Sequence, residues 1–119
     1  MSLLGVYLLQ QLRWPFVLHR KLAIEHEVPN LKTEAFQPYL KAETRQVWEL
    51  YKSGLLREIY FRADRNEAVL VLECENSLHA EEILSSLPLV KADLIRFELI
   101  PLKPYPGFER LFEADEPEE

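Results

Sequence analysis

The hydrophobic pattern of this 119-residue chain changes its period along the sequence, and the order of those changes leaves few folds open. Four segments show the alternation or the apolar run typical of β-strands, and they are residues 16–25, 55–62, 68–73 and 94–100. Two segments repeat apolar residues every three to four positions, as amphipathic helices do, and they are residues 33–53 and 77–87. The predicted order is therefore strand, helix, strand, strand, helix, strand.

This order predicts an α+β domain with the ferredoxin-like βαββαβ arrangement, a four-stranded antiparallel sheet with both helices on one face. In the first strand the apolar parity is Phe16, Leu18, Leu22 and Ile24, and the opposite parity includes Lys21, Ala23 and Glu25. The uncovered face of such a sheet would combine apolar groups with polar ones, among them Tyr60, Arg62, Arg96 and Glu98. A second copy of the chain covers such a face economically, so we expect a homodimer or larger oligomer.

Local signals set the expected helix ends. Thr33 is a start signal for the first helix, but Pro38 removes one backbone donor, so the regular helix is expected to begin nearer Gln37. Gly54 is expected to end it as a C-terminal cap. Asn76 or Ser77 is expected to cap the second helix, which Pro88 then stops, so that each helix has a sequence-defined start and end.

The chain divides into an N-terminal extension, 1–14, without an assigned role, a ferredoxin-like domain, 15–102, and a C-terminal arm with an acidic tail, 103–119. Prolines predict that the arm is extended, and they are Pro101, Pro104 and Pro106. The arm also carries apolar residues, Phe108, Leu111 and Phe112. We expect the arm to pack on a partner subunit, with binding to a proline-recognising domain as the alternative.

The distribution of charge and the number of cysteines limit the possible binding partners and the cellular compartment of the protein. Five of the twenty acidic side chains lie in the last seven residues, so the remaining body nearly balances its fourteen basic side chains. The basic residues alternate with acidic ones, which predicts no nucleic-acid partner. The single Cys74, the lack of a convincing signal peptide and the lack of a long apolar span predict a cytoplasmic protein that does not cross a membrane.

One acidic residue stands where the first helix should be apolar. The stripe on one helical face consists of Phe36, Leu40, Glu43, Val47 and Leu50. Burial raises the pKa of a carboxyl toward the range of a general base, whereas a neighbouring cation lowers it. The residue that contacts Glu43 therefore decides whether Glu43 has a structural role or acts as a general base.

Three short motifs lie within residues 39–107. They are Leu40-Lys41-Ala42-Glu43 in the first helix, Gly54-Leu55-Leu56-Arg57-Glu58-Ile59-Tyr60-Phe61-Arg62 at the second strand, and Leu87-Pro88-Leu89 after the second helix. Through these motifs, residues 39–107 resemble the muconolactone isomerase family of the dimeric α/β-barrel superfamily. The resemblance implies a dimeric α/β barrel and a cofactor-free isomerase that moves a proton on an unsaturated lactone or carbonyl compound. The N-terminal extension and the arm lie outside the similarity, so the identity of the substrate does not transfer.

The resemblance also implies roles for two residues. Glu43 would carry the proton, and Arg57 would bind a carboxylate or an enolate of the substrate. By strand parity Arg57 shares a face with Leu55, Ile59 and Phe61, so it is expected to meet Glu43 under the first helix. Such a pair can equally be structural, because a bidentate Arg lowers the pKa of a Glu. The alternative function is a non-catalytic small-molecule binder or oligomeric assembly module.

Two further residues are candidates for binding a small-molecule substrate. Tyr60 and Arg62 offer a hydroxyl and a fork of donors to an anion on the uncovered sheet face, with a cross-strand polar network as the alternative. The three histidines, His19, His26 and His79, have no ligand spacing with one another or with Cys74. No metal and no cofactor are therefore expected.

Overall fold

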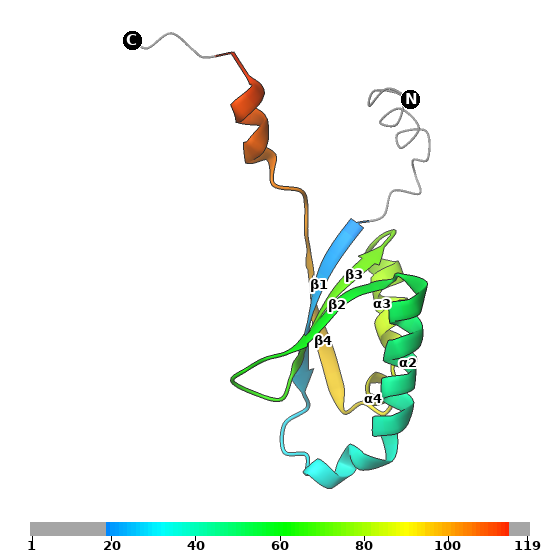
Figure 1. Ribbon diagram of the computed structural model, residues 1–119. Helices are drawn as coiled ribbons and strands as arrows, with labels where there is room; N and C mark the ends of the chain where they lie inside the picture. Colours follow the sequence, from blue (N-terminus) through cyan, green and yellow to red (C-terminus); the bar gives the residue numbers. More distant parts are fainter. Residues whose placement is uncertain (1–18, 115–119) are drawn as a thin grey trace.

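The computed structural model describes residues 19–114 as an α+β fold built on a four-stranded antiparallel sheet (Figure 1). The strands are β1 (His19–Glu27), β2 (Leu56–Phe61), β3 (Ala68–Cys74) and β4 (Ile95–Pro101). Their order in the sheet is β2-β3-β1-β4, and each neighbouring pair is antiparallel. This order is consistent with the ferredoxin-like topology that the sequence predicts.

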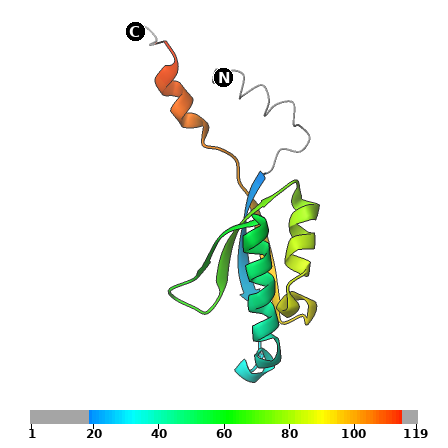
Figure 2. The same cartoon turned by 45° about the vertical axis from the view of Figure 1, so that its right-hand side comes forward.

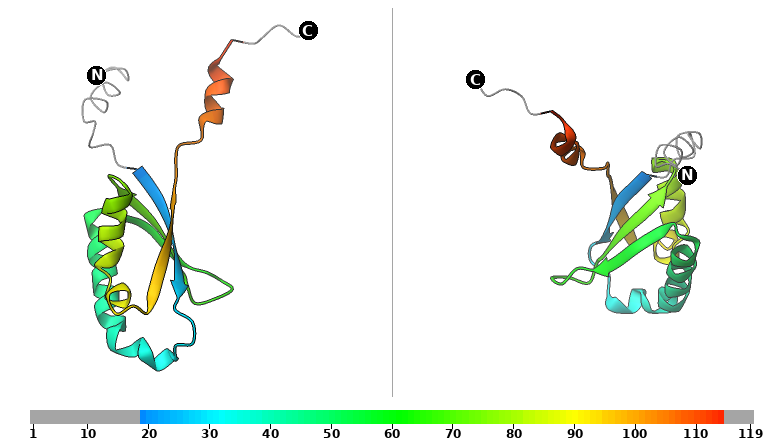
Figure 3. Two further views of the ribbon diagram at one scale, coloured as in Figure 1. Left: turned by 180° about the vertical axis from the view of Figure 1, so that it is seen from behind. Right: turned by 45° about the horizontal axis from the view of Figure 1, so that its top comes forward.

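The helices lie together on one face of the sheet (Figures 1 and 2). They are α2 (Leu40–Ser53), α3 (Ser77–Ser85) and the short α4 (Pro88–Lys91). The core lies between these helices and the sheet. It contains the predicted stripe of the second helical segment, Ala80, Ile83, Leu84 and Leu87, packed with strand residues such as Leu70 and Leu72. No helix of residues 19–114 covers the other face (Figure 3).

The expected helix ends are confirmed at Gly54 and Asn76, but Pro88 begins α4 instead of stopping the second helix, which already ends at Ser85. Two 3₁₀ turns, η1 (Thr33–Ala35) and η2 (Gln37–Tyr39), precede α2, because Pro38 occupies the first turn. Gly54 ends α2 with φ of 85°, the left-handed conformation that glycine adopts without a Cβ clash. Asn76 caps α3 by accepting a hydrogen bond from the backbone N–H of His79 at 2.8 Å.

The apolar parity of β1 faces away from the helices. Leu22 and Ile24 lie on the uncovered sheet face, where Leu22 pairs with Val71 and Ile100, and Ile24 pairs with Val69. The opposite parity of β1 is buried under the helices, and it consists of Lys21, Ala23 and Glu25. The parity of Ala23, and not that of Leu22, therefore faces the helices in this central strand, and Glu25 is placed inside the fold.

A β-bulge in β2 changes which of its side chains point toward the helices. Leu56 pairs with Leu72 and Glu58 pairs with Val71, so Arg57 has no partner position in the ladder. Leu56 is buried in the core, whereas Arg57 is exposed. The parity prediction that put Arg57 under the first helix is therefore wrong. From Glu58 onward the strand follows the predicted alternation.

The C-terminal arm leaves the domain beyond β4 (Figure 1). Its first part is extended as predicted, and the Leu102 backbone N–H donates to the Arg20 carbonyl oxygen at 3.0 Å. Pro106–Phe112 then forms a 3₁₀ helix, η3, so the expectation of an arm extended throughout is wrong. The predicted apolar side chains of the arm stay exposed, up to 87% for Phe112.

Some predictions concern residues outside 19–114. The N-terminal extension 1–14, the start of the first strand at Phe16 and the last five residues of the acidic tail lie outside the described range. Within that range, none of the helices has the length and the apolar character needed to cross a membrane. Cys74 is fully buried and belongs to the core, where a free cysteine packs as a small hydrophobic residue.

Candidate functional site

A cavity of about 390 Å³ lies on the helix-covered side of the sheet, between the end of β1 and the start of α2. Its apolar walls come from five different segments, and they are Leu31, Phe36, Leu40, Phe61, Leu89 and Ile95. Its polar lining residues are Glu25, Glu27, Thr33, Gln37 and Asn66. Apolar walls with a few convergent polar groups are the usual lining of a small-molecule site.

Glu25 is the most perturbed group of this cavity. It is only 8% exposed, because it lies on the buried parity of β1. The pKa of Glu25 is raised from 4.5 to about 7, mainly by burial and next by the charge of Glu27. A hydrogen bond from the Ala68 backbone amide acts against this rise, while the charges of Glu67 and Glu43 add to it. Near neutral pH, Glu25 therefore exists in both protonation states.

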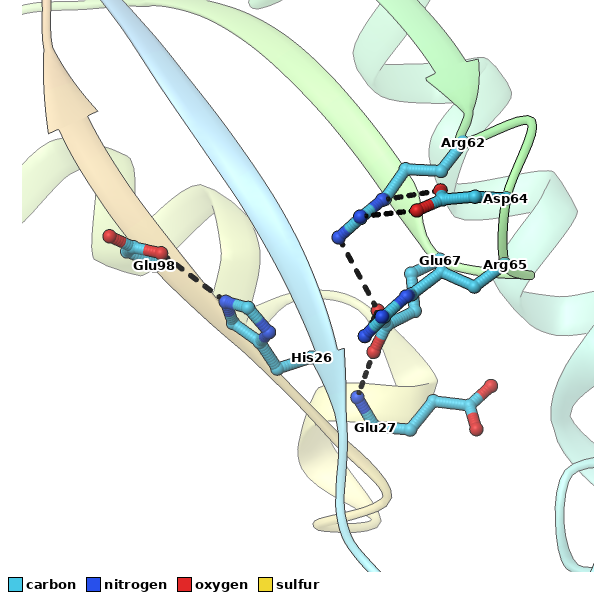
Figure 4. A network of polar contacts seen from close by, with 7 residues as sticks. All are labelled: His26, Glu27, Arg62, Asp64, Arg65, Glu67 and Glu98. Carbon is cyan, nitrogen blue, oxygen red and sulfur yellow. Dashed lines mark hydrogen bonds and ion pairs between the residues drawn. The ribbon is translucent and has the colours of Figure 1, made fainter.

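Three charged residues of the β2–β3 hairpin hold the end of β1 beside the hairpin (Figure 4). They are Arg62, Arg65 and Glu67, and we call them the clamp. The Glu67 carboxylate accepts a hydrogen bond from the Glu27 backbone N–H at 2.9 Å through Oε2. Its other oxygen, Oε1, is buried and accepts no hydrogen bond among residues 19–114. That oxygen lies 3.6 Å from Nη1 of Arg65 and 4.0 Å from Nη1 of Arg62. The clamp therefore fixes the backbone two residues after Glu25.

Glu43 lies half-buried on α2 and does not line the cavity. Its Oε1 accepts a hydrogen bond from the Leu89 backbone N–H at 2.9 Å. Burial raises the pKa of Glu43, and this hydrogen bond partly offsets the rise. The cavity adjoins Glu43 through Leu40, one helical turn earlier, and through Leu89 itself.

Arg57 does not meet Glu43. Its guanidinium forms an ion pair with Glu73 on β3, with 3.5 Å between Nε and Oε2, and half of its side chain is exposed. The bulge at Arg57 causes this placement, because it shifts the side chain off the helix-facing parity. The structure therefore separates the two residues that the resemblance implies as a catalytic pair.

Tyr60 and Arg62 are engaged with neighbouring acids. The Tyr60 hydroxyl donates to Glu58 at 2.9 Å, and this bond raises the pKa of Tyr60. Arg62 donates two hydrogen bonds to Asp64, at 2.9 and 2.7 Å, which lower the pKa of Asp64 (Figure 4). Because the Nε and Nη2 donors of Arg62 already bind Asp64, Arg62 has little capacity left to bind a substrate anion.

Sequence reasoning missed Glu25. The alternation predicted the strand, but it did not show which of its two parities faces the helices. A signal was present, because an apolar parity on a central strand can face a second copy instead of the helices. In that case the parity of Ala23 faces the helices, and Glu25 becomes a buried carboxyl.

No group of three or more His, Cys, Asp or Glu side chains in the described part of the chain is arranged to hold a metal ion. No protein-family model matches the sequence. No curated protein is significantly similar to it. The resemblance to the muconolactone isomerase family therefore stays a prediction.

Proposed function

We propose that this protein is a cofactor-free isomerase that moves a double bond in a small carbonyl compound, with Glu25 as the proton carrier. The proposal keeps the reaction that the family resemblance implies and changes the residue that carries the proton. The observation that supports it most is Glu25 itself, a buried carboxyl with a pKa raised to about 7 in a cavity of about 390 Å³. A general base works best when its pKa lies near the operating pH.

The reaction needs a base that both takes and returns a proton. The Glu25 carboxylate removes a proton from the carbon between the carbonyl group and the double bond, which leaves a dienolate. The Glu25 carboxylic acid then gives the same proton to the far carbon of that dienolate. The product is an isomer of the substrate with a conjugated double bond, so neither an oxidant nor a second reactant is needed.

Uncharged donors of the cavity are suited to the dienolate oxygen. Gln37 and Asn66 offer amide N–H groups and Thr33 offers a hydroxyl, and all three line the cavity. Donors placed where negative charge develops stabilise such an intermediate more than the uncharged substrate. They take the role that the resemblance implies for Arg57, which is paired with Glu73 instead.

The test uses 3-cyclohexen-1-one, a six-membered ring ketone that becomes 2-cyclohexen-1-one when its double bond shifts. Conjugation changes the ultraviolet absorption, so the rate is measured directly. The expected result is isomerisation by the native protein and a loss of about 100-fold or more in Glu25→Gln, the size of a general-base contribution. Glu43→Gln is the matched control, and it should keep most of the activity because Glu43 does not line the cavity.

Muconolactone is tested beside the ketone, in deuterated water, because the resemblance implies a lactone. Uptake of deuterium that depends on Glu25 would extend the proposal to lactones. If neither compound reacts, or if Glu25→Gln is as active as the native protein, the proposed reaction is wrong.

The alternative, an oligomeric assembly module, is favoured by a different observation. The uncovered sheet face carries a group of half-buried aliphatic side chains, and they are Leu22, Ile24, Val69, Val71 and Ile100. The same face carries polar residues, among them His26 and Glu98, whose side chains lie 3.3 Å apart. We infer that a second copy covers this face to form a homodimer of the dimeric α/β-barrel type, with the arm of each subunit packing on the other.

A further inference from the structure

The charged side chains that line the cavity all have one sign. Glu25 and Glu27 line it, and Glu43 and Glu67 add negative potential at Glu25 from α2 and from the hairpin. No lysine or arginine within residues 19–114 lines the cavity. In a partly enclosed site of low dielectric, such charges repel an anion and attract a cation more strongly than they would in water.

The two arginines of the β2–β3 hairpin beside Glu67 are already paired with acidic side chains. Arg62 binds Asp64 through two hydrogen bonds, and both Arg62 and Arg65 lie beside the Oε1 atom of Glu67. In the described part of the chain, no basic side chain forms an ion pair with Glu25, and its one hydrogen-bond donor is the Ala68 backbone amide. A carboxyl that is 8% exposed and faces a cavity is thus left without a cation.

The walls of the cavity decide which kind of cation fits. Aliphatic and aromatic side chains form most of the lining, including Phe36 and Phe61. An inorganic ion would lose its hydration against such walls, and the described residues hold no group of three or more His, Cys, Asp or Glu side chains that could replace its water ligands. An organic cation places its apolar body against them, and aromatic faces attract its charge further.

We propose that the cavity selects a small organic cation, an ammonium group on an apolar ring or chain, with the ammonium group at Glu25 and Glu27. If the bound cation is the substrate, the inference rests on the proposed function, and the substrate is then an amino-substituted carbonyl compound. As a statement about binding it rests on the cavity alone.

Binding of the cation is coupled to the protonation of Glu25. An ammonium group favours the carboxylate, so below neutral pH the bound cation displaces a proton from Glu25. Glu27, Glu67 and Glu43 are the charged groups that act on Glu25, and all three favour its protonated form in the empty cavity. The affinity for a cation should therefore rise between pH 5.5 and about 7.5.

Three probes of nearly equal size separate charge from shape. They are benzylammonium, benzyl alcohol and benzoate, and each is titrated into the full-length protein while the backbone amides of Glu25, Glu27 and Leu89 are followed by NMR. Benzylammonium should bind at least about tenfold more tightly than benzyl alcohol, and benzoate more weakly than either. Glu25→Gln should reduce the affinity for benzylammonium about tenfold and leave that for benzyl alcohol unchanged.

Glu81→Gln is the matched control, because Glu81 is exposed on α3 and does not line the cavity. It should leave all three affinities as they are in the native protein. Benzoate binding as tightly as benzylammonium overturns the inference, and so does a lack of benzylammonium binding at about 10 mM. Cation selectivity without isomerisation of the ring ketone would refute only the proposed function, whereas isomerisation with a preference for benzoate would refute only this inference.

Discussion

The Glu43 carboxylate accepts the backbone N–H of Leu89 at 2.9 Å, which ties α2 to the first turn of α4. α4 begins at Pro88, so Leu89 is its second residue and its N–H has no acceptor within the helix. A side chain from a distant element thus supplies the cap that the residue before α4, Leu87, cannot provide. The acidic residue in the apolar stripe of α2 therefore has a structural role.

Glu43→Ala should destabilise the protein by about 1–2 kcal/mol, because Leu89 is buried and its N–H would lose its acceptor. Glu43→Gln keeps an oxygen at the same place and should cost less than half as much. Urea unfolding at neutral pH measures both changes. Glu49→Ala on the exposed side of α2 is the control, and equal stabilities of Glu43→Ala and Glu49→Ala would contradict the capping role.

Glu25 should make the folded protein less stable as the pH rises. Its pKa is raised to about 7 in the folded state from 4.5, so between these values the folded state binds more protons than the unfolded state. The free energy of unfolding therefore falls with increasing pH across this window, by roughly 3 kcal/mol in total. Glu25→Gln should stabilise the protein by up to this amount at pH 8 and change little at pH 5. Equal effects of Glu25→Gln at the two pH values would show that burial does not perturb Glu25.

Arg57→Gln should have a small effect. The Arg57–Glu73 pair spans 3.5 Å and half of the arginine is exposed, so its contribution to stability should be below about 1 kcal/mol. Isomerisation of the ring ketone should proceed at nearly the native rate, since Arg57 does not line the cavity. A large loss of activity in a folded Arg57→Gln variant would restore the role that the family resemblance implies.

A charge on the uncovered sheet face should separate the subunits. Val71→Lys places an ammonium group among Leu22 and its neighbours, and we expect it to weaken self-association by about 100-fold or more. Leu78→Lys on the exposed side of α3 is the matched control, because Leu78 is 64% exposed and lies away from that face. Sedimentation velocity over a range of concentrations gives the dissociation constants. A native protein that stays monomeric at about 100 μM would contradict the homodimer.

The order of the elements could be predicted because helix and strand periods are local properties of the sequence. The caps at Gly54 and Asn76 were also predictable, since a left-handed residue and a side-chain acceptor belong to particular residue types. The strand order β2-β3-β1-β4 is consistent with the topology inferred from that order.

The site was less predictable, because it depends on which face of each strand meets the helices. A central strand has two faces, and Leu22 and Ile24 gave the uncovered face the stronger apolar pattern. The bulge at Arg57 adds one residue to β2, and no residue type in that segment requires it. Both effects arise from packing, and together they placed Glu25 in the cavity and took Arg57 away from Glu43.

Titration of the Glu25 carboxyl carbon by ¹³C NMR, with Glu25→Gln used to assign the resonance, shows whether burial in the cavity makes Glu25 a group that takes and returns protons at neutral pH. We predict a midpoint near pH 7 in the native protein, as the structure indicates. A midpoint near 4.5, the ordinary value of a glutamate, would contradict this role of Glu25 and leave the cavity without a base.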